Sequence, residues 1–421
     1  MLVDKIKCQI SEHLLFYKNV IWLYLLQVAQ YILPFLTFPY LTRILRPDHF
    51  AVYAYVSAFF GIIGVIVNFG FNLSGTRMVS LVRHDLRKVS RIVGQITYAK
   101  LLVAVVLFFI VCFICRFVDI LRDNFFFVML FYVNVVLNSL MPDFVFQSYE
   151  KMKSLTTRYL LVKTISVIGI LLLIRTPDDL IIIPVIYIVC SFIGYRLTIL
   201  SMRKIFSITI DWSATTGVIE QLKKSYIYCF SELSSSLLSG FITVIIGIVF
   251  TDKTEVSYWS IGITAISAVQ SLYSPIVNSL YPHMINKCDL KFAFRLGIVF
   301  APILIVGTVL FVILSDFIVS VIAGSEYGPA TRVLILLSPI LPISFYGIFI
   351  GWPILGALGQ VKALTISTII SGLANVFLIC FFMFFNVLSV ELLCFIRCFV
   401  ECLMLVLRSV ALYVYLKNIY I

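Results

Sequence analysis

The sequence has little charge and few histidines, and both shortages restrict the class of protein. Asp, Glu, Lys and Arg make up only 12% of the 421 residues, whereas 62% are hydrophobic and the mean hydropathy is +1.08. This composition excludes a soluble fold, which needs far more polar surface. The four histidines are far apart, and most of the ten cysteines lie in apolar stretches, where free Cys packs as a small hydrophobe. We therefore expect no metal site and no cofactor.

The chain also lacks a long polar segment, a low-complexity run or a soluble appendage. Instead, apolar segments follow one another along its length, each close to the ~20 residues that a helix needs to cross a bilayer. We count about twelve, at 20–40, 50–73, 92–115, 125–147, 159–174, 180–201, 226–250, 257–281, 293–315, 333–356, 363–385 and 391–414. The sequence predicts an all-α integral membrane protein whose function is built from the helices themselves.

Lysine and arginine are concentrated on alternate connections between these segments. Most of the 32 lie in the N-terminal arm, the even-numbered connections and the C-terminal end, with the densest cluster at Arg77, Arg83, Arg87, Lys88 and Arg91. By the positive-inside rule, both termini are cytoplasmic. The first 18 residues show no cleavage pattern, so we expect no removable signal peptide. We interpret the net charge of +12 as topology signals beside anionic lipid head groups, not as a nucleic-acid interface.

The longest cytoplasmic connection, roughly 202–224, divides the predicted helices six and six. A weak internal similarity supports two halves, because the residues around Asp48 match those around Asp252 at an offset of 204. Equal halves of the same orientation are typical of transporters that rock two bundles around a midplane site. We predict an N-terminal six-helix half at 1–205 and a C-terminal six-helix half at 206–421.

Polar residues follow helical spacing along four of the predicted helices. The clearest stripes are in span two, which ends at Asn72, and in span seven, where Glu232 is followed by Ser235, Ser236 and Ser239. Two interpretations stay open: small polar residues that let helices pack closely, or the lining of a wet path. The amides and the carboxylate favour a lining, because an unpaired amide facing hydrocarbon costs ~2–7 kcal/mol.

Five ionisable residues inside the spans are candidate functional groups. Lys100 lies about eight residues into span three, where a buried cation costs roughly 2.5–3.5 kcal/mol, so we expect an anionic partner or water beside it. Arg397 and Glu401 are spaced i, i+4 and either neutralise each other or act separately. Glu232 and Asp143 are the other acidic candidates, and Glu232 is the best placed to titrate.

Several sequence segments together resemble a known family of membrane transporters. The first two are QYILPFLTFPYLTRIL, with Pro34, Pro39, Thr42 and Arg43, and NFGFNLSGTR, with Gly70, Phe71 and Asn72; later ones are FQSYEKMK at 146–153, SLYPHM at 279–284 and SPILPIS at 338–344. They resemble the O-antigen flippases of the multidrug/oligosaccharidyl-lipid/polysaccharide (MOP) exporter superfamily. The resemblance covers nearly the whole chain. It departs at Arg46 and Ala51, where the family usually has glycine, and at Asp143 and Ser148.

The resemblance implies a V-shaped bundle of about twelve helices like that of multidrug exporters. It also implies that the chain carries an undecaprenyl-diphosphate-linked oligosaccharide from the cytoplasmic to the periplasmic leaflet of the bacterial inner membrane, for lipopolysaccharide biosynthesis. Its partners would then be membrane lipids, the O-antigen polymerase and the chain-length machinery. We expect Arg77, Lys100, Arg397 and Asn72 to bind the substrate, since a diphosphate in the membrane needs cations and polar groups. Glu232, Glu401 and Asp143 are the expected ion-coupling residues.

Two other functions compete with this interpretation. A multidrug antiporter or another lipid-linked glycan flippase would use the same architecture, and the drug exporter would prefer acidic cavity residues. An O-antigen polymerase would be an enzyme with a large periplasmic loop carrying catalytic Arg or His residues. The longest outer connection, about 316–332, contains only Asp316, Glu326 and Arg332 as charged residues. We therefore expect a transporter and not an enzyme.

The charge asymmetry predicts that the connections at 74–91 and 202–224 are cytoplasmic and that 316–332 is outside. In a variant without the native cysteines, Arg83→Cys should stay unlabelled by an impermeant maleimide in intact cells, and Glu326→Cys should be labelled. Both should react after the membrane is permeabilised, which serves as the control. Labelling of position 83 in intact cells would reverse the orientation.

Overall fold

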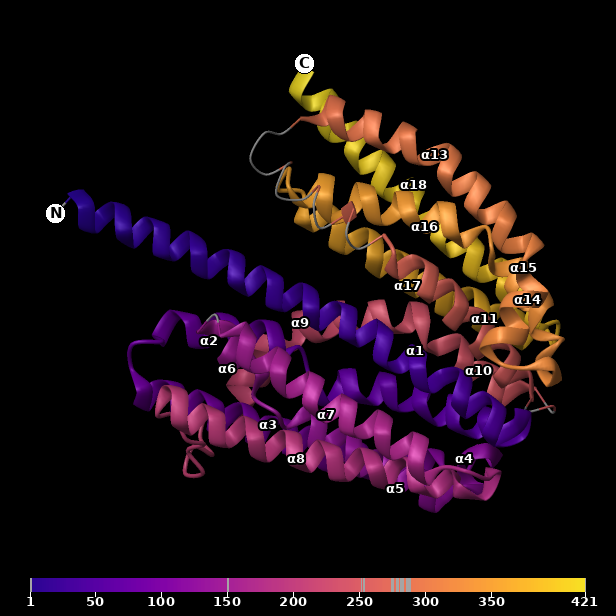
Figure 1. Ribbon diagram of the computed structural model, residues 1–421, viewed down its shortest axis with the longest axis horizontal. Helices are drawn as coiled ribbons and strands as arrows, with labels where there is room; N and C mark the ends of the chain where they lie inside the picture. The colour runs from indigo at the N-terminus through magenta and orange to yellow at the C-terminus, as the bar shows by residue number, and fades with distance from the viewer. Residues whose placement is uncertain are drawn as a thin grey trace. The chain divides into compact units, whose positions relative to one another are not determined.

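The computed structural model describes residues 2–149, 151–250, 252, 254–273, 276–277, 280, 284 and 289–420, with side chains from Ile21 onward except at a few helical positions. These residues are almost entirely helical and contain no strand (Figure 1). The elements are α1 (Leu2–Asn68), α2 (Phe71–Val82), α3 (Leu86–Ile114), α4 (Asp119–Asp123), α5 (Phe125–Ser139), α6 (Asp143–Ser148), α7 (Met152–Leu173), η1 (Pro177–Ile181), α8 (Ile182–Phe206), α9 (Val218–Ser239), α10 (Phe241–Val249), α11 (Thr254–Ser271), α13 (Leu290–Ile313), α14 (Ser315–Ile322), η2 (Ser325–Tyr327), α15 (Ala330–Leu337), α16 (Ile340–Phe349), η3 (Ile350–Gly356), α17 (Val361–Phe384) and α18 (Val390–Tyr420).

Seven segments of the described chain are long and apolar enough to cross a membrane, or eight if the pair Ala330–Leu337 and Ile340–Gly356, bent by 43°, is one span. The first, Leu25–Val82, contains most of predicted spans one and two. The all-α membrane architecture predicted from the sequence is confirmed. Most of the SLYPHM signature at 279–284 lies outside the described residues.

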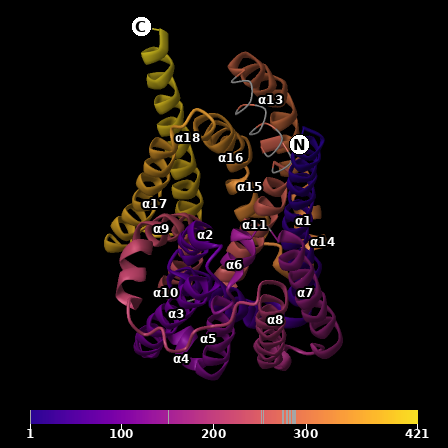
Figure 2. The same cartoon turned by 90° about the vertical axis from the view of Figure 1, so that its left-hand side faces the viewer.

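The chain forms two compact units, each discontinuous in sequence: unit 1 contains 1–40 and 63–230, and unit 2 contains 41–62 and 231–421. In unit 1, α8 packs against α5 and α7 (Figure 2). Phe71, Val93 and Phe144 belong to one apolar core, to which Leu155 of α7 and Met202 of α8 also contribute. In unit 2, α17 and α18 form a helical hairpin. The half boundary predicted at 205 and 206 stays a prediction.

The first helix is interrupted at Arg46, where φ is 56° and ψ is 171°. This conformation favours glycine and costs a residue with a side chain roughly 1–3 kcal/mol. Pro47 follows, and a proline disfavours helical geometry in the residue before it. The departure from the family pattern at Arg46 therefore falls where a glycine would be unstrained.

The Thr-Arg pair before this break closes the end of another helix in unit 2. Thr42 Oγ1 donates to the Ile322 carbonyl at 3.1 Å, and Arg43 Nη2 donates to the Val321 carbonyl at 2.8 Å. Both carbonyls belong to the last turn of α14, which has no intrahelical partner for them. The quoted motif thus contributes a C-terminal cap supplied by side chains.

Gly70 starts a second break, between α1 and α2. Its φ is +68°, and Phe69 before it also has a positive φ, of 48°. A Cβ atom on residue 70 would lie 2.5 Å from Tyr228 Cβ and 2.7 Å from the Cys229 backbone nitrogen of α9. Ser74 and Ser225 hydroxyls join the same two helices at 2.7 Å. Glycine is required here by both the backbone angle and the close approach of α9.

Candidate functional site

Arg77 and Asn72 lie on α2, in unit 1. Arg77 is exposed, and its Nη1 is 3.5 Å from the Tyr228 hydroxyl of α9. Asn72 is half-buried, and its carbonyl accepts a hydrogen bond from Thr76 Oγ1 at 2.5 Å. The same Thr76 hydroxyl is 3.1 Å from Gln147 Oε1. Arg77 is thus the exposed cation of α2, whereas Thr76 is hydrogen-bonded within the bundle.

Lys100, by contrast, is enclosed in unit 1, with 1% of its surface exposed. Its ammonium donates to the Ser139 carbonyl at 2.5 Å and to Asn68 Oδ1 at 3.2 Å, and it lies 6.0 Å from the centre of the Phe144 ring. Ser139 is the last residue of α5, so its carbonyl has no partner within that helix. Lys100 therefore caps the C-terminus of α5, where a cation also matches the helix dipole. In this conformation the side chain does not reach the protein surface.

Asp143, at the start of α6, forms an ion pair with Arg158 of α7. The two oxygens of the carboxylate accept from Arg158 Nη1 at 2.6 Å and Nη2 at 2.9 Å, a bidentate geometry. Arg158 Nη1 also donates to Thr198 Oγ1 at 2.5 Å. Our sequence reasoning missed Arg158, because a partner fifteen residues away on another helix leaves no periodic signal.

Arg397 and Glu401 form a buried ion pair within α18, in unit 2. Arg397 Nη2 lies 2.7 Å from Glu401 Oε1, and the side chains are 9% and 6% exposed. Mutual neutralisation, one of the two interpretations left open, is what the structure shows. Among the described residues, Arg397 Nε and Nη1 and Glu401 Oε2 have no hydrogen-bond partner.

Arg408, also on α18, is a buried cation that sequence reasoning did not single out. Its Nη1 donates to the Gly347 carbonyl at 2.6 Å, and its Nη2 donates to Thr368 Oγ1 at 3.1 Å. Gly347 lies in the last turn of α16, just before the π-helical turn η3. The residue lies near the C-terminal end of the last span, where a cation usually reaches the membrane surface. Arg408 reaches the Gly347 carbonyl at the point where α16 passes into η3, and the sequence does not reveal this change of helix type.

Glu232 lies on α9, half-buried, shortly before α9 gives way to α10 at Gly240. The side chains of Ser235 and Ser239 lie outside what the structure describes, so the predicted serine stripe cannot be followed. Glu232, Arg397 and Glu401 belong to unit 2. Arg77, Asn72, Lys100 and Asp143, the remaining predicted site residues, belong to unit 1.

The fold is shared with solved membrane exporters. An inward-facing multidrug MATE transporter of the MOP superfamily aligns with a TM-score of 0.72 at 11% identity, covering 95% of this chain and 98% of its own. The lipid II flippase MurJ, in an inward closed conformation, aligns with a TM-score of 0.69 at 13% identity, covering 93% of this chain and 87% of its own. The bundle therefore defines a multi-pass membrane protein with the MOP exporter fold.

The sequence comparisons identify the family. Residues 16–286 match the model of the polysaccharide biosynthesis protein family, and the chain belongs to it. A protein of Escherichia coli K12 named "Putative O-antigen transporter" is 25% identical over 340 residues, covering 77% of this chain and 79% of its own. A Shigella dysenteriae protein of the same name is 24% identical over 317 residues, covering 74% and 78%. The resemblance stated from the sequence motifs is confirmed.

Proposed function

We propose that this protein moves an undecaprenyl-diphosphate-linked O-antigen repeat unit from the cytoplasmic to the periplasmic leaflet of a bacterial inner membrane by alternating access. The observation that carries the proposal is the family match over residues 16–286 together with relatives named as O-antigen transporters over three quarters of the chain. A fold shared with a lipid II flippase supports a lipid-linked substrate. The predicted orientation, with both termini in the cytoplasm, belongs to the same proposal.

Within this mechanism, Arg77 is the residue best placed to bind the diphosphate. It is the exposed cation of α2, and a guanidinium binds phosphate oxygens through paired donors. Asn72, one turn and a half away on the same helix, supplies a polar group for the same ligand. Lys100 and Arg397 are enclosed in the described conformation, so their contact with substrate requires the helices around them to move.

The proposed transport predicts a specific intermediate in cells that lack the protein. Deleting the gene should make lipid-linked repeat units accumulate on the cytoplasmic side and remove the surface glycan, and the wild-type gene should restore it. Mass spectrometry of extracted lipids measures the intermediate. Repeat units that reach the outer leaflet but stay unpolymerised would instead indicate a polymerase, and an unchanged glycan would indicate export of another substrate.

The cationic site predicts different outcomes for its two residues in unit 1. Arg77→Ala should abolish most surface glycan. Its free energy of unfolding should stay within about 0.5 kcal/mol of wild type, because Arg77 is exposed. Lys100→Ala should lower both transport and stability, the latter by ~1–3 kcal/mol, because the Ser139 carbonyl loses its buried donor. Lys163→Ala, on α7, serves as the control and should be mild, because the half-buried lysine ammonium lies over the Tyr187 ring and outside the proposed site. Normal glycan in the Arg77→Ala strain at native expression would remove Arg77 from the proposed site.

Ion coupling is proposed to depend on Glu232. A carboxylate in an apolar span has its neutral form favoured by desolvation, while nearby hydroxyls and water favour its charged form, so movement of the helices can shift the balance. Glu232→Gln keeps the shape and removes the titration. We expect it to slow translocation in reconstituted vesicles and to abolish the response to a pH gradient. If the variant responds to the gradient as wild type does, the coupling group is elsewhere, and Glu401 and Asp143 are next to test.

A further inference from the structure

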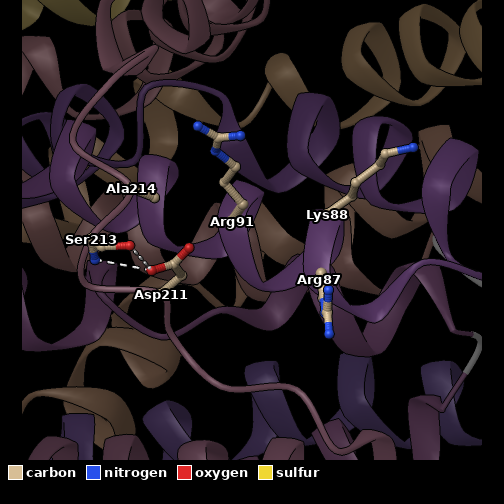
Figure 3. Close-up of a pocket in the computed structure, with 6 residues that line it drawn as sticks. All are labelled: Arg87, Lys88, Arg91, Asp211, Ser213 and Ala214. Atoms are coloured by element: carbon tan, nitrogen blue, oxygen red, sulfur yellow. Dashed lines mark hydrogen bonds between the residues drawn. The ribbon is translucent and has the colours of Figure 1, made fainter.

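A basic cavity of about 290 Å³ lies beside the first turns of α3, wholly within unit 1. One wall consists of Arg87, Lys88 and Arg91 from α3, and the other consists of Asp211, Ser213 and Ala214 from the connection after α8 (Figure 3). In the view of Figure 3, the ends of Lys88 and Arg91 extend to the same side of α3, and Arg87 extends to the other. The cavity is therefore bordered by three cations and one carboxylate.

The second wall is held firmly against α3. The Asp211 carbonyl approaches Gly94 so closely that a Cβ atom there would lie 2.1 Å from it. Tyr98 Oη donates to the Trp212 carbonyl at 2.5 Å, and Gln95 Nε2 donates to the Thr216 carbonyl at 2.7 Å. The connection thus forms a fixed wall and not a loose loop, so the cavity exists before any ligand binds.

Lys88 Nζ is paired with Asp85 Oδ2 at 3.3 Å, so three cations face the two carboxylates of Asp85 and Asp211, and an excess of positive charge remains. Both the Ser213 amide, at 3.0 Å, and the Ser213 hydroxyl, at 2.6 Å, donate to Asp211 Oδ1. These bonds, with a smaller contribution from Arg91, lower the pKa of Asp211 from its usual value, so the carboxylate is charged at neutral pH. Within the described part of the chain, neither guanidinium, of Arg87 or of Arg91, has a hydrogen bond or a close ion pair. Two strong donors are therefore available to an anion.

Two exposed apolar residues adjoin the lining residues in sequence. Leu86 precedes Arg87 and is 43% exposed, and Trp212 lies between Asp211 and Ser213 and is 55% exposed. Tryptophan next to cationic residues is typical of the membrane interface, where the ring lies among lipid head groups. Basic pockets at the ends of membrane helices bind phosphate head groups of anionic lipids.

We propose that this cavity binds the phosphate group of an anionic phospholipid in the adjacent leaflet. Arg91 holds the phosphate oxygens, Arg87 and Lys88 add positive charge, and the lipid's glycerol and acyl chains lie along Leu86 and Trp212, each adjacent in sequence to a lining residue. The site is separate from the proposed transport path and does not depend on flipping activity. A soluble diphosphate shares the same chemistry, and the apolar border favours the lipid.

The test is a native mass spectrometry titration of the purified full-length protein in detergent with phosphatidylglycerol, phosphatidylcholine or inorganic pyrophosphate. Arg87→Gln with Arg91→Gln should weaken phosphatidylglycerol binding roughly tenfold or more. Lys151→Gln with Lys153→Gln, which removes two exposed cations at the start of α7, away from the residues that line the cavity, should change it by less than about twofold. Phosphatidylcholine should bind weakly to all variants.

The Asp211→Asn variant tests directly whether the ligand of the cavity is an anion. Asparagine keeps an oxygen at the position that accepts both Ser213 bonds, so the wall is preserved while a negative charge is removed. Binding of phosphatidylglycerol should tighten if the cavity takes an anion. An unchanged or weaker affinity in this variant, or equal losses in the two double variants, would overturn the site. Loss of pyrophosphate binding alone in Arg87→Gln with Arg91→Gln would overturn the lipid as its occupant.

Discussion

The structure depends on side chains that donate hydrogen bonds to carbonyl groups at broken helix ends. A helix leaves its last carbonyls without intrahelical partners, and in a membrane no water is available to satisfy them. Lys100 fills that role in unit 1 by donating to the Ser139 carbonyl at the end of α5, whereas in unit 2 Arg408 donates to the Gly347 carbonyl of α16, which also accepts from the Ile350 N–H. Short and bent helices, which a continuous span would avoid, are thereby stabilised. Each cation in turn replaces part of its lost hydration with a carbonyl oxygen.

This requirement separates cations that hold the fold from cations that can serve a substrate. A buried cation that caps a helix cannot leave its carbonyl without exposing an unsatisfied group, at a cost of ~1–3 kcal/mol. Arg77 does not cap a helix in this way. Its guanidinium is exposed, and Arg77 Nη1 is 3.5 Å from the Tyr228 hydroxyl, which is a long hydrogen bond. The proposed substrate contact therefore depends mainly on Arg77. For Lys100, a loss of transport by itself would not distinguish substrate binding from helix capping.

The sequence predicted the class of fold well and the environment of single charges poorly. Hydrophobic length and periodicity identify helices because each span must satisfy its own backbone, a local property of the chain. The strained residue Arg46 falls in the connection predicted between the spans at 20–40 and 50–73, whereas the break at Gly70 falls inside the second of these predicted spans. The bidentate pair of Asp143 with Arg158 and the hydrogen bond from Arg408 to the Gly347 carbonyl depend on which helices become neighbours. That information is not local, so periodicity could not reveal it.

The pair of Arg397 and Glu401 shows how a buried charge can be tolerated without being strongly stabilising. Attraction between the two groups offsets the cost of removing them from water, and such pairs often contribute little net stability. The donors and the acceptor that remain unpartnered in the described residues reduce the gain further. Removing either partner is different, because it leaves a single uncompensated charge in the bundle, at a cost of ~3–5 kcal/mol. The pair is therefore inexpensive to rearrange but costly to break, which is the energetic condition that the predicted ion-coupling role of Glu401 requires.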